Sequence, residues 1–233
     1  MCFPFSFQNA VFSQISFDHY IDVGNNNVSQ GVYTDFSTRV LVQSGSNRVS
    51  SGALLSFSNA QKNIFSAYFL SFSREIYERN HPINIEGFYL CKPFSEDLRE
   101  FNVGFIADYR NKHFGFNLGF NSRLYSFTRA AKLKYNIPDS VSTRVWVPIN
   151  LMYQLSYFQP LNKKMLLEVR VTDFNTYTIL QETNPMILTK FTYTLNDKIQ
   201  FYSELCYMQA GLLNIRVNYF GYYLRGGVLW QIK

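Results

Sequence analysis

The stretch FNVGFIADYRNKHFGFNLGFNSRL, residues 101–124, decides the fold of this 233-residue chain. Across 101–109 every odd position is apolar, whereas across 114–124 the apolar residues fall on even positions. Alternation with a period of two is typical of a β-strand that has one apolar face. A two-residue turn at Asn111-Lys112 would produce this change of parity and keep both apolar faces on the same side. The stretch therefore predicts an antiparallel β-hairpin.

The same alternation recurs along the whole chain. It is clear at 11–23, 32–42, 49–57, 145–157, 165–171, 199–207, 213–219 and 222–232, and fainter at 63–73, 83–91 and 176–183. Single-chain bacterial barrels have an even number of strands, so we expect about fourteen strands, with twelve as the alternative. Pro148 lies inside a strong strand and predicts a bulge there, because proline cannot donate a ladder hydrogen bond. No linker or repeat interrupts the pattern, which predicts one domain over 1–233.

The composition indicates which face meets water. Charged residues make up 16% of the chain, against roughly 25% in soluble domains, and aromatic residues make up 18%. The polar strand positions carry Gly, Asn, Ser, Gln, Tyr and Arg, whereas lysines such as Lys112 and Lys163 fall in turns. Compact polar residues of this kind suit a hydrated interior better than a surface in bulk water. The apolar positions would then face lipid.

Aromatic residues at the strand ends support this interpretation. Tyr109, Phe114 and Tyr157 lie on the apolar parity beside predicted turns, as in the aromatic girdles of membrane barrels. No apolar run approaches the roughly 18–20 residues of a membrane-spanning helix. An open sheet edge is not tolerated in lipid, so the sheet must close. We predict an all-β fold, a closed antiparallel up-and-down transmembrane β-barrel; a soluble β-sandwich or soluble barrel is the alternative.

The last strand carries a motif on its two faces. The motif consists of Arg225, Gly227, Trp230 and Ile232. It resembles the C-terminal β-signal of outer-membrane barrel proteins: a polar residue, a glycine, then two large apolar residues on one face. The resemblance implies an outer-membrane protein whose final strand is recognised by the barrel-assembly machinery and closes against the first strand.

Two features depart from the bacterial pattern. Bacterial barrels usually end on the aromatic residue of the signal, whereas Lys233 ends this chain. The N-terminus also has no basic segment and no long apolar segment of a secretory signal. We favour a bacterial barrel and keep a mitochondrial-type barrel, or a merely well-formed edge strand at the C-terminus, as alternatives.

No catalytic or metal-binding constellation stands out. Zinc spacings, phosphate loops and nucleophile elbows are absent from the sequence, so we predict no enzyme, no metal and no cofactor. His19 shares the apolar parity of its strand, and with Ser13 or Ser16 it leaves open a lipid-hydrolysing barrel. The net charge of +6 is spread along the chain without a basic block, which argues against nucleic acid as a partner.

Arginines recur on the polar parity. They are Arg39, Arg110, Arg123, Arg144, Arg170, Arg216 and Arg225, and the acids assigned to the same parity are Asp35, Asp108, Glu168 and Glu204. Rings of such residues bias pores toward anions. The alternative is that the arginines pair with the acids and fill the barrel. Arg216 and Glu204 form a predicted cross-strand pair, and Arg170 and Glu168 share a face.

These patterns favour a porin-like passive pore or barrel scaffold, with no enzymatic step and with selectivity set by the inward arginines. Its partners would be membrane lipid and the assembly machinery. The first alternative is a structural or assembly partner of a larger surface or secretion complex, which would dock through the loops 74–82 and 128–142. The second is the lipid-hydrolysing barrel.

Overall fold

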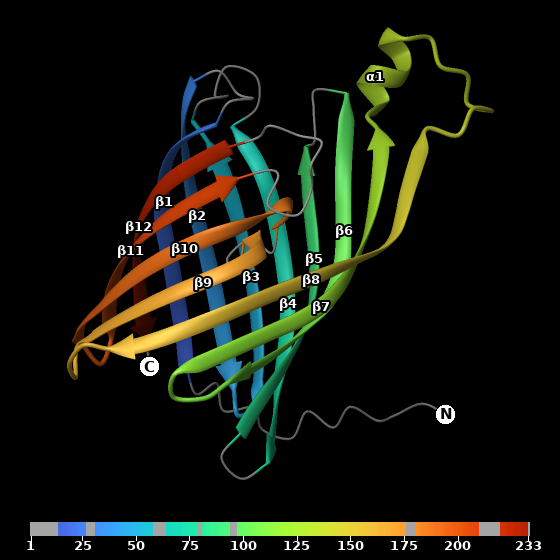
Figure 1. Cartoon of the computed structure of the whole chain (residues 1–233). Helices are drawn as coiled ribbons and strands as arrows, with labels where there is room; N and C mark the ends of the chain where they lie inside the picture. The colour runs from blue at the N-terminus through green and yellow to red at the C-terminus, as the bar shows by residue number, and fades with distance from the viewer. Residues whose placement is uncertain are drawn as a thin grey trace, which may run out of the picture.

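The protein is a closed antiparallel β-barrel in which every strand pairs with its neighbour in sequence and the last strand pairs with the first. The structure is a computed structural model that describes residues 14–26, 31–57, 64–78, 81–93, 97–175, 180–209 and 220–232. Its strands are β1 (Gln14–Asn26), β2 (Gly31–Ser44), β3 (Asn47–Ser56), β4 (Phe65–Glu78), β5 (His81–Pro93), β6 (Leu98–Arg110), β7 (Phe114–Phe127), β8 (Arg144–Pro160), β9 (Met165–Asn175), β10 (Leu180–Asn196), β11 (Ile199–Gln209) and β12 (Phe220–Ile232). One short helix, α1 (Arg129–Lys134), lies above the barrel (Figure 1).

The two ends of the barrel differ. At one end the strands are joined by tight turns, such as Gly45-Ser46 between β2 and β3 and Asp197-Lys198 between β10 and β11. Strand β1 begins and strand β12 ends there too, because an even number of antiparallel strands brings both to the same side. At the other end lies the connection between β7 and β8, which carries α1 (Figure 1). In bacterial barrels short turns face the periplasm and long loops face the outside.

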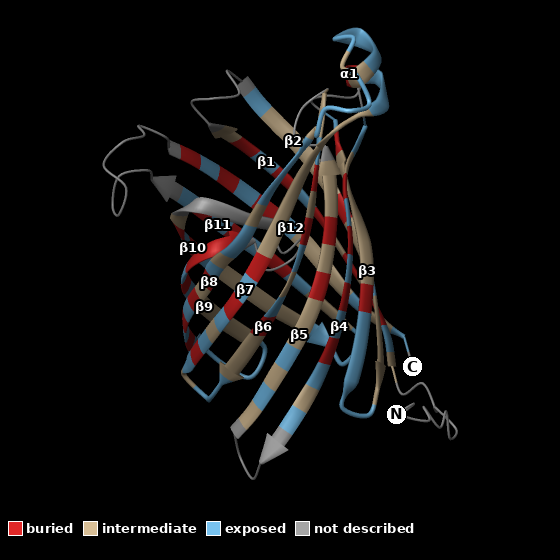
Figure 2. Cartoon of the chain, turned by 90° about the vertical axis from the view of Figure 1, so that its right-hand side faces the viewer, coloured by how far each residue is buried: buried red, intermediate tan, exposed pale blue. Residues whose placement is uncertain are grey.

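The outer face is apolar and exposed, and the inner face is largely buried. On β7 the outward residues Phe114 and Phe120 are 59% and 40% exposed, while the inward Asn121 is 3% exposed. Buried and exposed residues alternate in this way along most strands (Figure 2). From Phe114 to Leu124 the strand rises roughly 33 Å, which at a typical tilt spans about 25 Å, the height of the apolar band of membrane barrels. The outward face therefore meets hydrocarbon, and the soluble alternatives are excluded.

The twelve strands match the lower of the two predicted numbers. The predicted strand at 213–219 lies outside the described residues, and the faint segment at 176–183 overlaps the start of one long strand, β10. No helix within the described ranges has the length and hydropathy needed to cross a bilayer.

The hairpin of β6 and β7 forms as predicted, with its turn one residue later. Arg110 pairs with Gly115, so the turn residues are Lys112 and His113 rather than Asn111 and Lys112. The Asn111 side chain explains the shift, because its Oδ1 accepts hydrogen bonds from the backbone N–H of His113 at 2.9 Å and of Phe114 at 2.7 Å.

The bulge predicted at Pro148 is confirmed. Asn121 pairs with Asn150 and Arg123 pairs with Val147, so one residue of β7 faces two residues of β8. A bulge of this kind reverses the parity of the strand beyond it. Val147 consequently points inward, and Arg144, paired with Ser126, takes the outer face. The prediction that Arg144 faces the lumen is wrong for this reason.

The loop predicted at 74–82 is mostly strand. The residues 74–78 belong to β4 and 81–82 belong to β5, so this region is a hairpin with a short connection. Strand β4 was hard to recognise in the sequence because residues 67–70 are all apolar, although their side chains point alternately to the lumen and to the lipid. A long loop is therefore not available there for docking.

Candidate functional site in the barrel lumen

Six neighbouring strands place one row of charged residues across the inner face. Their cross-strand register aligns Glu168, Lys190, Glu204, Arg225, Asp22 and Asp35, from β9 through to β2. The signs alternate over the first five positions. We call these six residues the charge belt. Directly opposed opposite charges stabilise a pair of strands, and this applies to the first four pairs of the belt, whereas the last pair, Asp22 and Asp35, carries like charges.

Arg225 is the centre of the belt and is 1% exposed. Its Nε and Nη2 donate to the two carboxylate oxygens of Asp22 at 2.6 and 2.8 Å, and its Nη1 donates to Glu204 at 3.0 Å. The guanidinium also lies 4.1 Å above the ring of Tyr20. Bidentate binding of this kind fixes the arginine and both acids in one geometry.

Arg170 extends this network from the neighbouring row. It donates to the second oxygen of Glu204 and lies 3.3 Å from Glu168. The prediction that Arg170 and Glu168 share a face is thus confirmed. Glu204 is bound by Arg170 and Arg225, while its predicted partner Arg216 lies outside the described residues.

A second set of contacts surrounds Asp18. Arg39 donates to it at 2.8 Å and the Tyr202 hydroxyl donates to it at 2.7 Å. Tyr202 can reach Asp18 because Gly227, its cross-strand partner, leaves room for the phenol ring. Lys190 lies 4.3 Å above the same ring.

Towards the long-loop end a third group surrounds Glu100, which is 1% exposed. Its carboxylate oxygens lie 3.4 Å from Lys92 and 3.8 Å from Arg123. Arg123 therefore faces the lumen, as predicted, and contributes to a buried ion pair.

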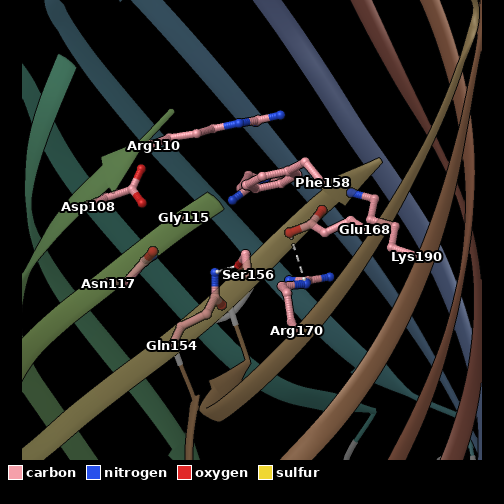
Figure 3. A pocket seen from close by; sticks show the side chains of 11 residues that line it. Asp108, Arg110, Gly115, Asn117, Gln154, Ser156, Phe158, Glu168, Arg170 and Lys190 are labelled. Carbon is pink, nitrogen blue, oxygen red and sulfur yellow. Dashed lines mark hydrogen bonds and ion pairs between the residues drawn. The ribbon is translucent and has the colours of Figure 1, made fainter. Parts of the chain in front are cut away.

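A cavity of about 220 Å³ opens inside the barrel near the short-turn end. Its charged lining consists of Asp108 and Arg110 from β6, Glu168 and Arg170 from β9 and Lys190 from β10 (Figure 3). Arg39 from β2 completes the charged lining. The Arg110 guanidinium stacks 3.8 Å above the ring of Phe158. The cavity lining thus combines four cationic side chains and one aromatic ring with two acids.

Two residues of this cavity, Phe158 and Lys190, were not predicted from the sequence. Phe158 follows the even, inward parity of β8, so extending the alternation by one position would have found it. Lys190 lies in a segment of β10 where no strand was predicted, and it is placed opposite Glu168 and Glu204 only by register. No simple sequence signal would have identified Lys190.

Part of the inner face is apolar, contrary to the expectation of a polar lumen throughout. Phe88, Ile106, Met152 and Phe174 form one buried cluster, and Ala67, Phe69 and Leu90 form another. These clusters lie on β4–β6, β8 and β9, and the charge belt lies on β9–β12, β1 and β2. Two more buried clusters, one of Met186, Leu188, Cys206 and Tyr223 and one of Tyr20 and Tyr202, lie among the strands of the charge belt, so apolar and charged residues share the inner face.

The inner face also carries acids that the sequence analysis did not assign to it. These are Asp18, Asp22, Glu75, Glu86 and Glu100. Within the described ranges the inward acids are about as numerous as the inward bases. The expected excess of arginine over the whole lumen is therefore not found, and the cavity is a place where bases exceed acids locally.

The arrangement around His19 does not form a hydrolase site with Ser16. Ser16 is buried on the inner face, whereas His19 lies on the outer face between the rings of Phe17 and Phe36, each 6.2 Å away. The two side chains are three positions apart on a strand and so point to opposite faces. Ser13 lies outside the described residues. Within the described ranges, no three His, Cys, Asp or Glu side chains converge as metal ligands.

The C-terminal motif divides between the two faces as its alternation predicts. Arg225 and Gly227 point inward, and Trp230 and Ile232 are exposed on the outer face. Strand β12 pairs with β1 over its length, from Ile232 opposite Ile15 to Gly221 opposite Asn26. The predicted closure is confirmed, and recognition by the assembly machinery remains a prediction.

The predicted loop at 128–142 contains α1 and is anchored to the start of β6. The Thr128 side chain accepts from the N–H of Ala131 at 3.1 Å and caps the helix. The Tyr135 hydroxyl donates to Asp97 at 2.7 Å, and Lys134 lies 3.5 Å from the same carboxylate. Hydrogen bonding to Tyr135 and the charge of Asp97 raise the pKa of Lys134. This connection is consequently held at the mouth of the barrel.

Known structures resemble this barrel, although their sequences hardly do. No protein-family model and no curated protein sequence matches the chain. The KdgM porin in complex with disordered oligogalacturonate superposes with a TM-score of 0.57 at 9% identity, covering 94% of this chain and 99% of that one. The NanC porin superposes with a TM-score of 0.53 at 11% identity, covering 91% and 98%. The closed sheet and the outward apolar band identify the chain as a β-barrel of the membrane-spanning type, and this likeness shows that its fold is that of the porins on which it superposes.

Proposed function

We propose that the barrel is a passive pore that favours small hydrophilic anions. The observation that carries the proposal is the cavity inside the barrel, where Arg39, Arg110, Arg170 and Lys190 outnumber Asp108 and Glu168. A local excess of cations in a narrow aqueous passage lowers the free energy of an entering anion and raises that of a cation.

Arg110 is the best placed of these residues to contact a solute. Arg39 and Arg170 are held by Asp18 and Glu204, whereas Arg110 is exposed and stacks on Phe158. Stacking orients the planar guanidinium and leaves its N–H edge available for a carboxylate or phosphate. An aromatic ring beside such a donor also suits a sugar ring. The KdgM porin, which was solved with oligogalacturonate, supports an acidic oligosaccharide as one such solute.

Ion selectivity in planar bilayers tests the proposal. Under a KCl gradient the reversal potential of the wild-type pore should indicate chloride preference. The double variant Arg110→Gln with Lys190→Gln should move the permeability ratio toward one. Arg74→Gln removes one positive charge from the outer face of β4 and should leave the ratio unchanged. A cation-selective wild type, or equal ratios in all three proteins, would refute it.

A specific observation also favours a second candidate, a barrel that serves as a structural or assembly partner. The buried apolar clusters around Phe88 and Phe69 occupy part of the lumen, and the anchored connection with α1 offers a surface above the membrane. Such a barrel would insert, resist heat in detergent and show no conductance. If correctly folded protein shows no conductance in planar bilayers, the partner function is favoured over the pore.

We also propose that the assembly machinery recognises β12 through Trp230 and Ile232. Both side chains are exposed on the outer face at the strand end, where another protein can reach them before insertion. Exchange of both for serine should slow assembly in cells far more than refolding of the purified chain into vesicles. An equal effect on both would instead indicate a role in stability alone.

A further inference from the structure

Three neighbouring strands place two arginines in one row on the lipid-facing side. Arg99 of β6 pairs with Ser126 of β7, which pairs with Arg144 of β8. Arg99 points outward because the adjacent Glu100 is buried inside, and Arg144 points outward because the bulge at Pro148 reverses its parity. Adjacent strands lie about 4.8 Å apart, so the two arginine Cα atoms are about 10 Å apart.

This row lies directly above the apolar band, at the long-loop end. The next outward row, one pleat lower, consists of Phe101, Leu124 and Trp146. Trp146 is 68% exposed and its Nε1 donates to the Ser122 hydroxyl, which fixes the ring against the barrel. Tryptophan in this orientation is typical of the membrane–water interface. The arginines one pleat higher therefore lie at the level of the lipid headgroups.

The barrel does not neutralise these two charges through its described residues. Neither Arg99 nor Arg144 forms an ion pair with a described carboxylate, and both side chains are exposed. Asp97 is held by Tyr135 and Lys134, and Glu100 is enclosed on the inner face. The row thus presents two guanidinium groups toward the membrane boundary.

We propose that the row of Arg99, Ser126 and Arg144 binds the phosphate groups of an anionic lipid in the leaflet on the long-loop side. A guanidinium binds phosphate through two parallel N–H donors, and two of them at this spacing can hold two phosphates of one headgroup. The acyl chains of that lipid would pack on Phe101, Leu124 and Trp146 below. This lipid site lies on the outside of the barrel and is independent of what the lumen passes.

Lipid binding to the purified, folded barrel tests the site. The probes are lipid A with two phosphates, its monophosphorylated form and phosphatidylcholine, each added to delipidated protein in detergent and counted by native mass spectrometry. Lipid A should bind most tightly and phosphatidylcholine least. Arg99→Gln or Arg144→Gln should weaken lipid A binding roughly 5-fold, and the double variant about 30-fold, since each basic residue near anionic lipid contributes on the order of 1 kcal/mol. Arg74→Gln, an outward arginine at the opposite end, is the matched control.

Each contrary result would overturn the proposal. The row is not the site if the double variant binds lipid A as the wild type does, or if Arg74→Gln weakens binding equally. Displacement of lipid A by millimolar inorganic phosphate would show a simple anion site instead of a lipid site. Both arginines are exposed, so all variants should keep the heat-resistant folded band in electrophoresis, and loss of binding cannot then be attributed to unfolding.

Discussion

Replacing Arg225 by methionine should destabilise the barrel strongly. Arg225 is 1% exposed and forms three hydrogen bonds of 2.6 to 3.0 Å with Asp22 and Glu204. Methionine fills a similar volume without the charge, so the main effect is to leave two buried carboxylates without this partner. Breaking a buried ion pair in this way costs about 3–5 kcal/mol. We expect a loss of this size in the free energy of unfolding.

Urea unfolding of the barrel in lipid vesicles, followed by tryptophan fluorescence, measures this loss. With a slope of about 1–3 kcal/mol per molar urea, the midpoint should fall by about one molar or more. Arg225→Lys keeps the charge but not the bidentate geometry, and should fall between wild type and Arg225→Met. Adding Asp22→Asn and Glu204→Gln to Arg225→Met should recover part of the stability, because no unpaired charge then remains. The exposed control Arg74→Met should change the free energy by less than about 0.5 kcal/mol. A loss below about 1 kcal/mol for Arg225→Met would refute the reasoning.

Two further predictions concern the last strand. Gly227→Ala should lower the free energy of unfolding by about 1–3 kcal/mol, because the new methyl would overlap the Tyr202 ring. Gly226→Ala should be neutral, because its methyl meets no atom within 4 Å. A lower urea midpoint for Gly227→Ala than for Gly226→Ala would agree with this, and equal midpoints would contradict it. Ile21 and Gly226 pair directly across the closing strands, so cysteines at both positions, in a chain otherwise free of cysteine, should form a disulfide on oxidation. A shift of the folded band in non-reducing electrophoresis reports the bond, and its absence would mean that β1 and β12 are not paired in this register.

The strands and their faces could be predicted because alternation is local. The hairpin at 101–124 needed no knowledge of the rest of the chain, and Pro148 indicated its bulge through the missing N–H alone. The position of the turn could not be predicted to the residue, since it depends on which backbone groups the Asn111 side chain binds. The face of Arg144 was predicted wrongly for a related reason, because a bulge reverses the face to which every residue of the strand beyond it points.

The charge belt could not be predicted because it depends on register between distant strands. Asp18 and Asp22 alternate with Phe17 and Ile21, so their inward direction was readable, but not that Arg225 would lie opposite Asp22. The inner apolar clusters were missed for another reason. A strand such as β4 is apolar on both faces at 67–70, and periodicity then carries no signal for the side that points inward.

The pairing of Arg225 with Asp22 has a consequence for how the barrel forms. These residues are 203 positions apart, so the bond cannot exist until the final strand has been synthesised and brought against the first. Until then Asp22 lacks its guanidinium partner, and in a chain truncated before Arg225 the Asp22 carboxylate would remain without it. The last strand thereby supplies the guanidinium that neutralises Asp22, and we expect chains that lack this strand to be less stable and more susceptible to proteolysis.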